Sequence, residues 1–206
     1  MDIITRITRQ RGKMQIAISE QETIVVPLSL FRERPLTEGQ PINLEEYDNW
    51  LMVRQYRHAL DRAVACLAAR AHSKHEIEQK LLRVGYRPCT VEMVLYKLER
   101  EHLLNDADFA RQWVEARSGR KLGRSRIAQE LRRKGIDADE AEEALSAIGE
   151  DAQLADAIAL AEKAAAHAKP DEDPRKTYQR IAAMLARRGF RWDIAKEALA
   201  QVLQAD

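Results

Sequence analysis

The sequence has few of the residues that build disulfide-linked, membrane-spanning or aromatic-rich proteins. Aromatic residues make up 5% of the chain, and only two of its 206 residues, Cys66 and Cys89, are cysteine. The cysteines lie in helix-like segments without CxxC spacing, so we interpret both as reduced packing residues. No stretch approaches the roughly 18 consecutive apolar residues of a membrane span, and the N-terminus lacks the apolar run of a signal peptide. These absences predict a soluble, cytoplasmic protein.

Net charge is also small, because 34 basic and 33 acidic residues leave a formal charge of +1. The local balance is uneven. Residues 105–135 hold nine basic and four acidic residues, residues 136–174 hold two and twelve, and residues 175–206 hold seven and three. Alternating basic and acidic zones indicate a basic face for an anionic partner and a separate acidic face. Ordinary solvated helix surfaces are the alternative interpretation.

Motifs that carry chemistry are scarce as well. We find no Ser/His/Asp or Cys/His arrangement and no paired carboxylates, and the loop at 117–126 lacks the GKS or GKT ending of a nucleotide-binding P-loop. His72 and His75 have no further ligand at metal-binding spacing. Asp106 and Asp108 fit the start of a helix, where negative charge is favourable. We therefore predict a protein that is not an enzyme and holds no metal or cofactor.

The sequence does contain a helical pattern that occurs three times. Each copy has Ile, then Leu four positions later, then Gly four positions further, then a large apolar residue, starting at Ile77, Ile127 and Ile181. A period of about 50 residues indicates stacked copies of one small helical unit. Glycine after the last turn can take the left-handed backbone that ends a helix. We expect this of Gly85, Gly135 and Gly189.

Further helical segments surround each copy. Helices are predicted before the copies at 59–71, 109–118 and 154–167, the last of them rich in alanine. The helices after the copies repeat one apolar face: Val91, Val94, Leu95 and Leu98, then Ala141, Ala144, Leu145 and Ile148, then Ala195, Ala198, Leu199 and Val202. The predicted fold is mainly α: an elongated, curved tandem array of three three-helix repeats at 59–104, 105–150 and 151–206.

The first 42 residues follow a different pattern. Apolar and polar residues alternate at 3–8 and 14–19, and a β-rich run follows at 23–26. These runs predict a small N-terminal antiparallel β-meander, which three short strands can sustain only by packing on a helix. Pro35, Gly39 and Pro41 indicate a linker. A connecting helix, capped by Asn43, is expected at 43–58, with a break near 54–58.

Basic residues concentrate in the loop and helix start of the second repeat, at 117–126. Two glycines would keep this loop mobile, and amide groups at a helix N-terminus can bind phosphate oxygens. Simple solvation, or compensation of the helix dipole near the glycines, is the alternative. The residues that we predict to contact a protein or DNA partner are Arg70, Lys74, Lys80, Arg83, Arg111, Arg117, Arg120, Lys121, Arg124, Arg126, Arg132, Arg133, Lys134, Arg187 and Arg188.

Four motifs in a fixed order resemble those of a known family. They are Ala69-Arg70-Ala71-His72-Ser73 with the helix to Gly85, Leu104-Asn105-Asp106 with Phe109-Ala110, Gly123 with the helix to Lys134-Gly135-Ile136, and Arg188-Gly189-Phe190. Over about residues 59–203 the chain resembles the RecX family of bacterial recombination regulators. The β-rich front piece is similar to an N-terminal extension of some members.

This resemblance implies a partner and an activity. Members of the family bind RecA, dock in the helical groove of the RecA–DNA filament and bridge neighbouring protomers. They limit filament growth and so restrain strand exchange, ATP hydrolysis and the co-protease activity of the SOS response in DNA repair and recombination. We accordingly expect a monomer that binds RecA in its filament form, with single- or double-stranded DNA as a further partner. The alternative is a sequence-nonspecific DNA-binding helical protein that acts without RecA.

Overall fold

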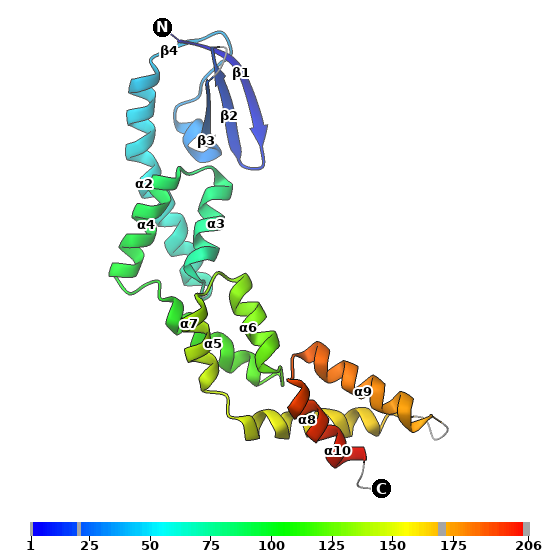
Figure 1. Ribbon diagram of the computed structural model, residues 1–206. Coiled ribbons are helices and arrows are strands. Elements are labelled where there is room, and N and C mark those ends of the chain that lie inside the picture. Colours follow the sequence, from blue (N-terminus) through cyan, green and yellow to red (C-terminus); the bar gives the residue numbers. More distant parts are fainter. Residues whose placement is uncertain (1, 20–21, 169–171, 204–206) are drawn as a thin grey trace. The chain divides into compact units, whose positions relative to one another are not determined.

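The computed structural model describes residues 2–19, 22–168 and 172–203 (Figure 1). It is mainly helical with a small antiparallel sheet at the N-terminus, as predicted. The chain divides into two compact units, Met1–Asn105 and Asp106–Asp206, which we call the first and second unit.

The sheet of the first unit has four strands in the order β3-β2-β1-β4. The three predicted strands are β1 (Asp2–Gln10), β2 (Lys13–Ile18) and β3 (Glu22–Pro27), and they pair antiparallel in succession. The predicted linker is wrong at its end, because β4 (Pro41–Ile42) pairs with the start of β1. Proline is tolerated there since β4 is an edge strand. A short helix, α1 (Leu28–Glu33), was not predicted.

A single long helix connects the sheet to the first repeat. It is α2 (Leu44–Ala69), capped as predicted by the Asn43 side chain, which accepts a hydrogen bond from the Glu46 amide at 3.2 Å. The expected break near 54–58 is wrong, because the segment contains no glycine or proline to interrupt its hydrogen bonds. Tyr47 and Leu51 share one buried core with the sheet and with the rest of the first repeat.

The first repeat is completed by α3 (Lys74–Val84) and α4 (Pro88–Arg100). Ser73 and Glu76 form a capping box at the start of α3, and Gly85 ends that helix with φ of 101°, as expected of this glycine. The predicted apolar face of α4 is buried in the core of the first unit, where α4 packs against α2 and α3.

The second unit contains six helices within its described residues: α5 (Asp106–Ser118), α6 (Arg124–Arg133), α7 (Ala138–Ser146), α8 (Glu150–Ala165), α9 (Pro174–Arg188) and α10 (Trp192–Leu203). Gly135 and Gly189 have φ of 76° and 89°, as the repeat pattern predicted. Two apolar cores form, one in α5–α7 and one in α8–α10. The second of these is built largely from alanine, at Ala157, Ala161, Ala195 and Ala198.

Candidate partner-binding surface

The basic residues predicted to contact a partner divide into those that hold the fold together and those that remain exposed. The first group is concentrated in the second repeat. There, Glu130 of α6 accepts hydrogen bonds from the Arg117 Nε at 2.7 Å and from the Trp113 indole at 3.1 Å. The Arg126 guanidinium lies 3.4 Å from the same carboxylate. These cations are therefore engaged inside one repeat.

Trp113 is also enclosed by positive charge. The guanidinium of Arg117 and the ammonium of Lys134 each lie 4.0 Å from the centre of its ring. Cation–π contacts of this kind are favourable by roughly 0.5–2 kcal/mol. Burial alone would raise the pKa of Glu130, but the hydrogen bond and charge of Arg117, with the indole N–H, lower it overall. This cluster stabilises the packing of α5 on α6 and leaves little charge for a partner.

The loop between α5 and α6 is fixed to the third repeat. The Gly123 amide donates to the Arg188 carbonyl at 2.9 Å, and the Ser125 amide donates to the Gly189 carbonyl at 3.2 Å. The two backbones are so close that a Cβ added to Gly123 would lie 2.2 Å from the carbonyl carbon of Gly189. The expectation that two glycines keep this loop mobile is wrong, because Gly123 allows a close backbone contact.

Side chains reinforce this junction between the second and third repeats. The Arg188 guanidinium donates to the Arg120 carbonyl at 3.3 Å and to the Lys121 carbonyl at 3.5 Å. Buried Gln153 of α8 accepts from the Arg124 amide at 3.0 Å and donates to the Leu122 carbonyl at 3.5 Å. Two predicted cations pair with carboxylates nearby, Lys121 with Asp156 at 3.4 Å and Arg124 with Glu142 at 2.8 Å.

Other predicted residues have partners within their own repeat. Arg70 pairs with Glu76 at 3.0 Å, Lys74 with Glu99 at 2.7 Å, and Arg111 with Asp108. The Lys80 ammonium lies 3.9 Å from the Cys66 sulfur. Exposed pairs of this type contribute little to stability, so a partner could recruit these cations at small cost.

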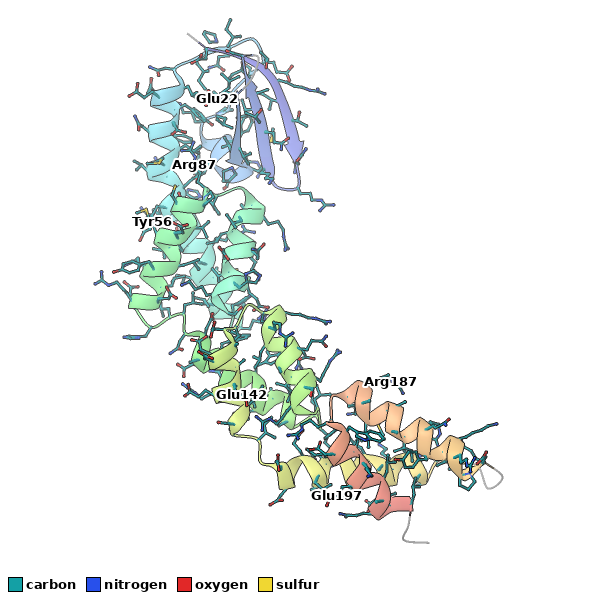
Figure 2. All side chains as sticks on the ribbon, in the orientation of Figure 1. Glu22, Tyr56, Arg87, Glu142, Arg187 and Glu197 are labelled. Carbon is teal, nitrogen blue, oxygen red and sulfur yellow. The ribbon has the colours of Figure 1, made fainter. Side chains whose placement is uncertain are left out.

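A second group of predicted cations is exposed and makes no hydrogen bond or ion pair with its side chain in the described part of the chain. Its members are Arg83, Arg120, Arg132, Arg133 and Arg187. Three of them occupy the same place in successive repeats, because Arg83, Arg133 and Arg187 each stand two residues before the left-handed glycine. Arg187 lies at the end of α9 (Figure 2). Each repeat thus presents one available guanidinium at an equivalent position.

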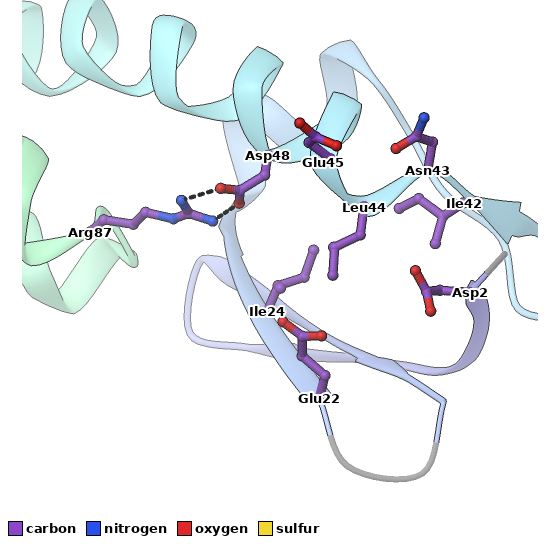
Figure 3. A pocket seen from close by; sticks show the side chains of 9 residues that line it. All are labelled: Asp2, Glu22, Ile24, Ile42, Asn43, Leu44, Glu45, Asp48 and Arg87. Carbon is purple, nitrogen blue, oxygen red and sulfur yellow. Dashed lines mark hydrogen bonds and ion pairs between the residues drawn. The ribbon is translucent and has the colours of Figure 1, made fainter.

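The first unit also contains an acidic cavity of about 770 Å³ between the start of α2 and the sheet (Figure 3). Its carboxylates are Asp2, Glu22, Glu45 and Asp48, and its apolar wall is formed by Ile24, Ile42 and Leu44. The hydrogen bond from Arg87 lowers the pKa of Asp48 and keeps this carboxylate ionised. Such a cavity repels phosphate groups, so a nucleic acid would contact other parts of this unit.

Among the described residues, no group of three His, Cys, Asp or Glu side chains is arranged to hold a metal ion. Over the same residues, none of the helices has the length and apolar character needed to cross a membrane.

Sequence reasoning missed the residues that engage the predicted cations. Glu130 and Gln153 were not among the predicted residues. Glu130 accepts from the Arg117 and Trp113 side chains, and Gln153 bonds one backbone amide and one backbone carbonyl. Glu130 stands four residues after Arg126, a spacing that favours an ion pair on a helix and could have indicated this contact. Gln153 carries no such signal, because its partners are about 30 residues away in the sequence.

Comparison with known proteins assigns the chain to a family. Three family sequence models match it, described as RecX, first three-helix domain (residues 59–98), second three-helix domain (105–145) and third three-helix domain (151–199). Regulatory protein RecX of Clostridioides difficile strain 630 is 30% identical over 210 residues, covering 100% of this chain and 98% of that protein. The chain belongs to the RecX family.

Other RecX proteins match most of the chain. Regulatory protein RecX of Prosthecochloris aestuarii is 36% identical over 148 residues, covering 71% of this chain and 95% of that protein. A solved structure titled "Crystal structure of regulatory protein RecX" covers 100% of both chains with a TM-score of 0.67 and 21% identity, a likeness of fold. RecX from Lactobacillus salivarius covers 75% of this chain and 99% of its own, with a TM-score of 0.66 and 25% identity.

Proposed function

We propose that this RecX-family protein is a non-catalytic regulator that binds the RecA–DNA filament in its helical groove and inhibits the recombinase, ATPase and co-protease activities of RecA. Membership of the family and the match to its three helical domains support this proposal. The cellular context would be the cytoplasm, in DNA repair, recombination and the SOS response.

The recurrence of an available arginine is the structural observation that carries the proposal. A RecA filament repeats the same protomer and the same phosphate backbone along its length, so a regulator that spans several protomers needs equivalent contacts at intervals. Arg83, Arg133 and Arg187 provide one such contact per repeat, and the described residues around them make no competing pair. A guanidinium can bind a carboxylate or a phosphate with two parallel hydrogen bonds.

Binding alone is sufficient for inhibition. A protein seated across neighbouring protomers stabilises their current arrangement and blocks the addition of further protomers. Because each filament-bound molecule would affect several protomers, the proposal predicts inhibition at amounts below one molecule per RecA. The expected measurement is the ATP turnover of RecA on single-stranded DNA, with this protein added. Unchanged turnover at equimolar protein would contradict the proposal.

A triple variant tests whether the recurring arginines form the contact surface. Replacing Arg83, Arg133 and Arg187 together by Gln should raise the concentration for half inhibition at least about tenfold, since each charged contact is worth roughly 0.5–1.5 kcal/mol. The matched control replaces three exposed cations that pair with carboxylates, namely Arg54, Lys97 and Arg191. Both variants lose the same formal charge. Equal loss of inhibition in the two would show that only net charge matters.

Sequence-nonspecific binding to DNA without RecA is the second candidate, favoured by the basic segment 117–134. The structure weighs against a large contact there, because most of these cations have internal partners. Binding through phosphates releases counterions, so affinity would fall steeply with salt. The slope of the logarithm of the binding constant against the logarithm of the salt concentration would be about −0.9 for each phosphate contact. Weak, nearly salt-independent binding to DNA alone would exclude this function while leaving the filament proposal intact.

A further inference from the structure

A cavity in the first repeat brings together a thiol, several cations and a buried imidazole. Its volume is about 490 Å³, and its walls come from α2, the loop after it and α3. Arg62, Cys66 and Ala69 lie on one face of α2, since they are spaced three or four residues apart. Arg70 and His72 line it from the loop, and Lys80 lines it from α3. All of these residues belong to the first unit.

His72 gives this cavity a polar group that lacks a partner. Its side chain is buried, with 4% of its surface exposed, and its Nδ1 lies 2.9 Å from the Arg70 carbonyl. A carbonyl can only accept, so Nδ1 carries the hydrogen and Nε2 is left as an acceptor. Nε2 has no hydrogen-bond partner in the described part of the chain. A buried acceptor without a donor is costly, and a bound molecule that offers a donor would remove this cost.

The charges around the cavity are mainly positive. Lys80 places its ammonium 3.9 Å from the Cys66 sulfur, and Arg62 makes no ion pair with a described residue. The charge of Arg70 is balanced by Glu76 at 3.0 Å. Burial lowers the pKa of His72, so its ring is neutral near pH 7 and adds no charge. An anion is therefore attracted to the region of the Cys66 thiol. The neutral imidazole can accept a hydrogen bond from a donor group of the bound molecule.

We propose that Cys66 is a site of S-thiolation by an anionic, low-molecular-mass disulfide. Lys80 and Arg62 hold the carboxylates of the disulfide, and the Cys66 sulfur attacks the nearer sulfur atom. The S–S bond of the reagent breaks, a new S–S bond joins its nearer half to Cys66, and the other half leaves as a thiol with the proton that Cys66 gives up. The disulfide itself is the oxidant. This inference does not depend on the proposed function.

Cys89 is an internal control for this reaction. It lies exposed in the first turn of α4 and does not line the cavity. Cys66 is partly buried, so access alone makes Cys89 the faster of the two. The distinguishing property is therefore the charge preference of Cys66, measured as a ratio between two reagents.

The experiment compares oxidised glutathione, which is anionic, with uncharged 2-hydroxyethyl disulfide on the full chain. Peptide mass spectrometry follows mixed-disulfide formation at each cysteine. The Cys66-to-Cys89 rate ratio should be at least about threefold higher with oxidised glutathione, because the local positive potential concentrates the anion. Equal ratios for the two reagents would overturn the proposal.

Two lysine variants locate the effect. Lys80→Met should lower the preference of Cys66 for the anionic reagent, because only Arg62 remains to hold it, whereas Lys74→Met, on the same helix but outside the cavity, should preserve it. The rate with the uncharged reagent reports any effect of the Lys80→Met substitution on the thiol itself, because a nearby cation stabilises the thiolate. The preference is therefore measured as the ratio of the two rates. An undiminished preference in the Lys80→Met protein would contradict the proposal.

Discussion

The glycine that ends a helix lies against different groups in the two units. In the first unit, a Cβ added to Gly85 would meet side-chain atoms of Val25 and Lys13 at 3.0 to 3.2 Å. In the second unit, a Cβ added to Gly189 would lie 2.4 Å from the backbone nitrogen of Arg126. Side chains can move by a few tenths of an ångström, but a backbone held by hydrogen bonds cannot. An added side chain should therefore be strained in both units and more costly in the second unit.

Alanine substitution at the two glycines should give the largest difference. Both have positive φ, so alanine costs about 1 kcal/mol at either position. Overpacking against the backbone adds roughly 1–3 kcal/mol for Gly189→Ala, and much less for Gly85→Ala. Urea unfolding of the two variants would measure this difference. Equal destabilisation would mean that the junction between the second and third repeats is less tightly packed than the structure indicates.

The buried glutamines provide a second, smaller contrast. Gln153 meets two backbone groups, whereas Gln55 of α2 accepts from the Arg87 amide at 3.0 Å and its Nε2 has no partner among the described residues. Replacement of either glutamine by Leu keeps the shape of the side chain but leaves the backbone amide that it accepts from, of Arg124 or Arg87, without its partner. We expect Gln153→Leu to cost about 2–3 kcal/mol and Gln55→Leu about 1 kcal/mol, from the same unfolding measurement. The reverse order would contradict the assigned roles.

Ion pairs in the two units should differ in their response to pH. Arg117 lowers the pKa of Glu130 overall against the effect of burial, and Arg87 lowers that of Asp48. A depressed folded pKa gives stability that is present above the unfolded value of about 4 and is lost as pH falls through the folded pKa. Glu130→Gln should cost roughly 1 kcal/mol at pH 7, and Asp48→Asn less, because Asp48 is 37% exposed.

Both losses should shrink as the pH falls below 4, where the wild-type carboxylates also become protonated. Chemical denaturation at pH 7 and at about pH 3 measures this change. A difference that persists at low pH would assign the effect to packing rather than to charge.

The smallest effect is expected where an arginine serves no internal contact. Arg133→Gln should change the free energy of unfolding by less than about 0.5 kcal/mol, whereas Arg117→Gln removes the contacts to Glu130 and Trp113 and should cost about 1 kcal/mol. Thermal unfolding of the two variants measures this. A large loss at Arg133 would remove it from the set of residues available to a partner.

Local sequence patterns were sufficient for most of the fold. Caps such as Asn43, the left-handed glycines and the apolar helix faces depend on neighbours close in the sequence, so the sequence could predict them. The continuity of α2 was missed because its weak apolar stripe gives no clear signal across residue 58.

The candidate site was less predictable for a physical reason. A basic residue has the same appearance in a sequence whether its charge faces water or a carboxylate 30 residues away. Arg188 and Arg187 are adjacent, yet one binds backbone carbonyls of another repeat and the other is exposed. Which positively charged side chains remain available depends on tertiary contacts, and these were not visible in the local pattern. The role of the exposed residues in binding stays a prediction.

The unbroken course of α2 has a mechanical consequence. At 1.5 Å per residue, its 26 residues form a rod of roughly 39 Å that is part of both the strand layer and the first helical repeat. Deleting one residue in the middle of this rod would turn its two halves by about 100° against each other and detach one of them from the shared core. The orientation of the N-terminal strands relative to the first repeat thus depends on the length of α2.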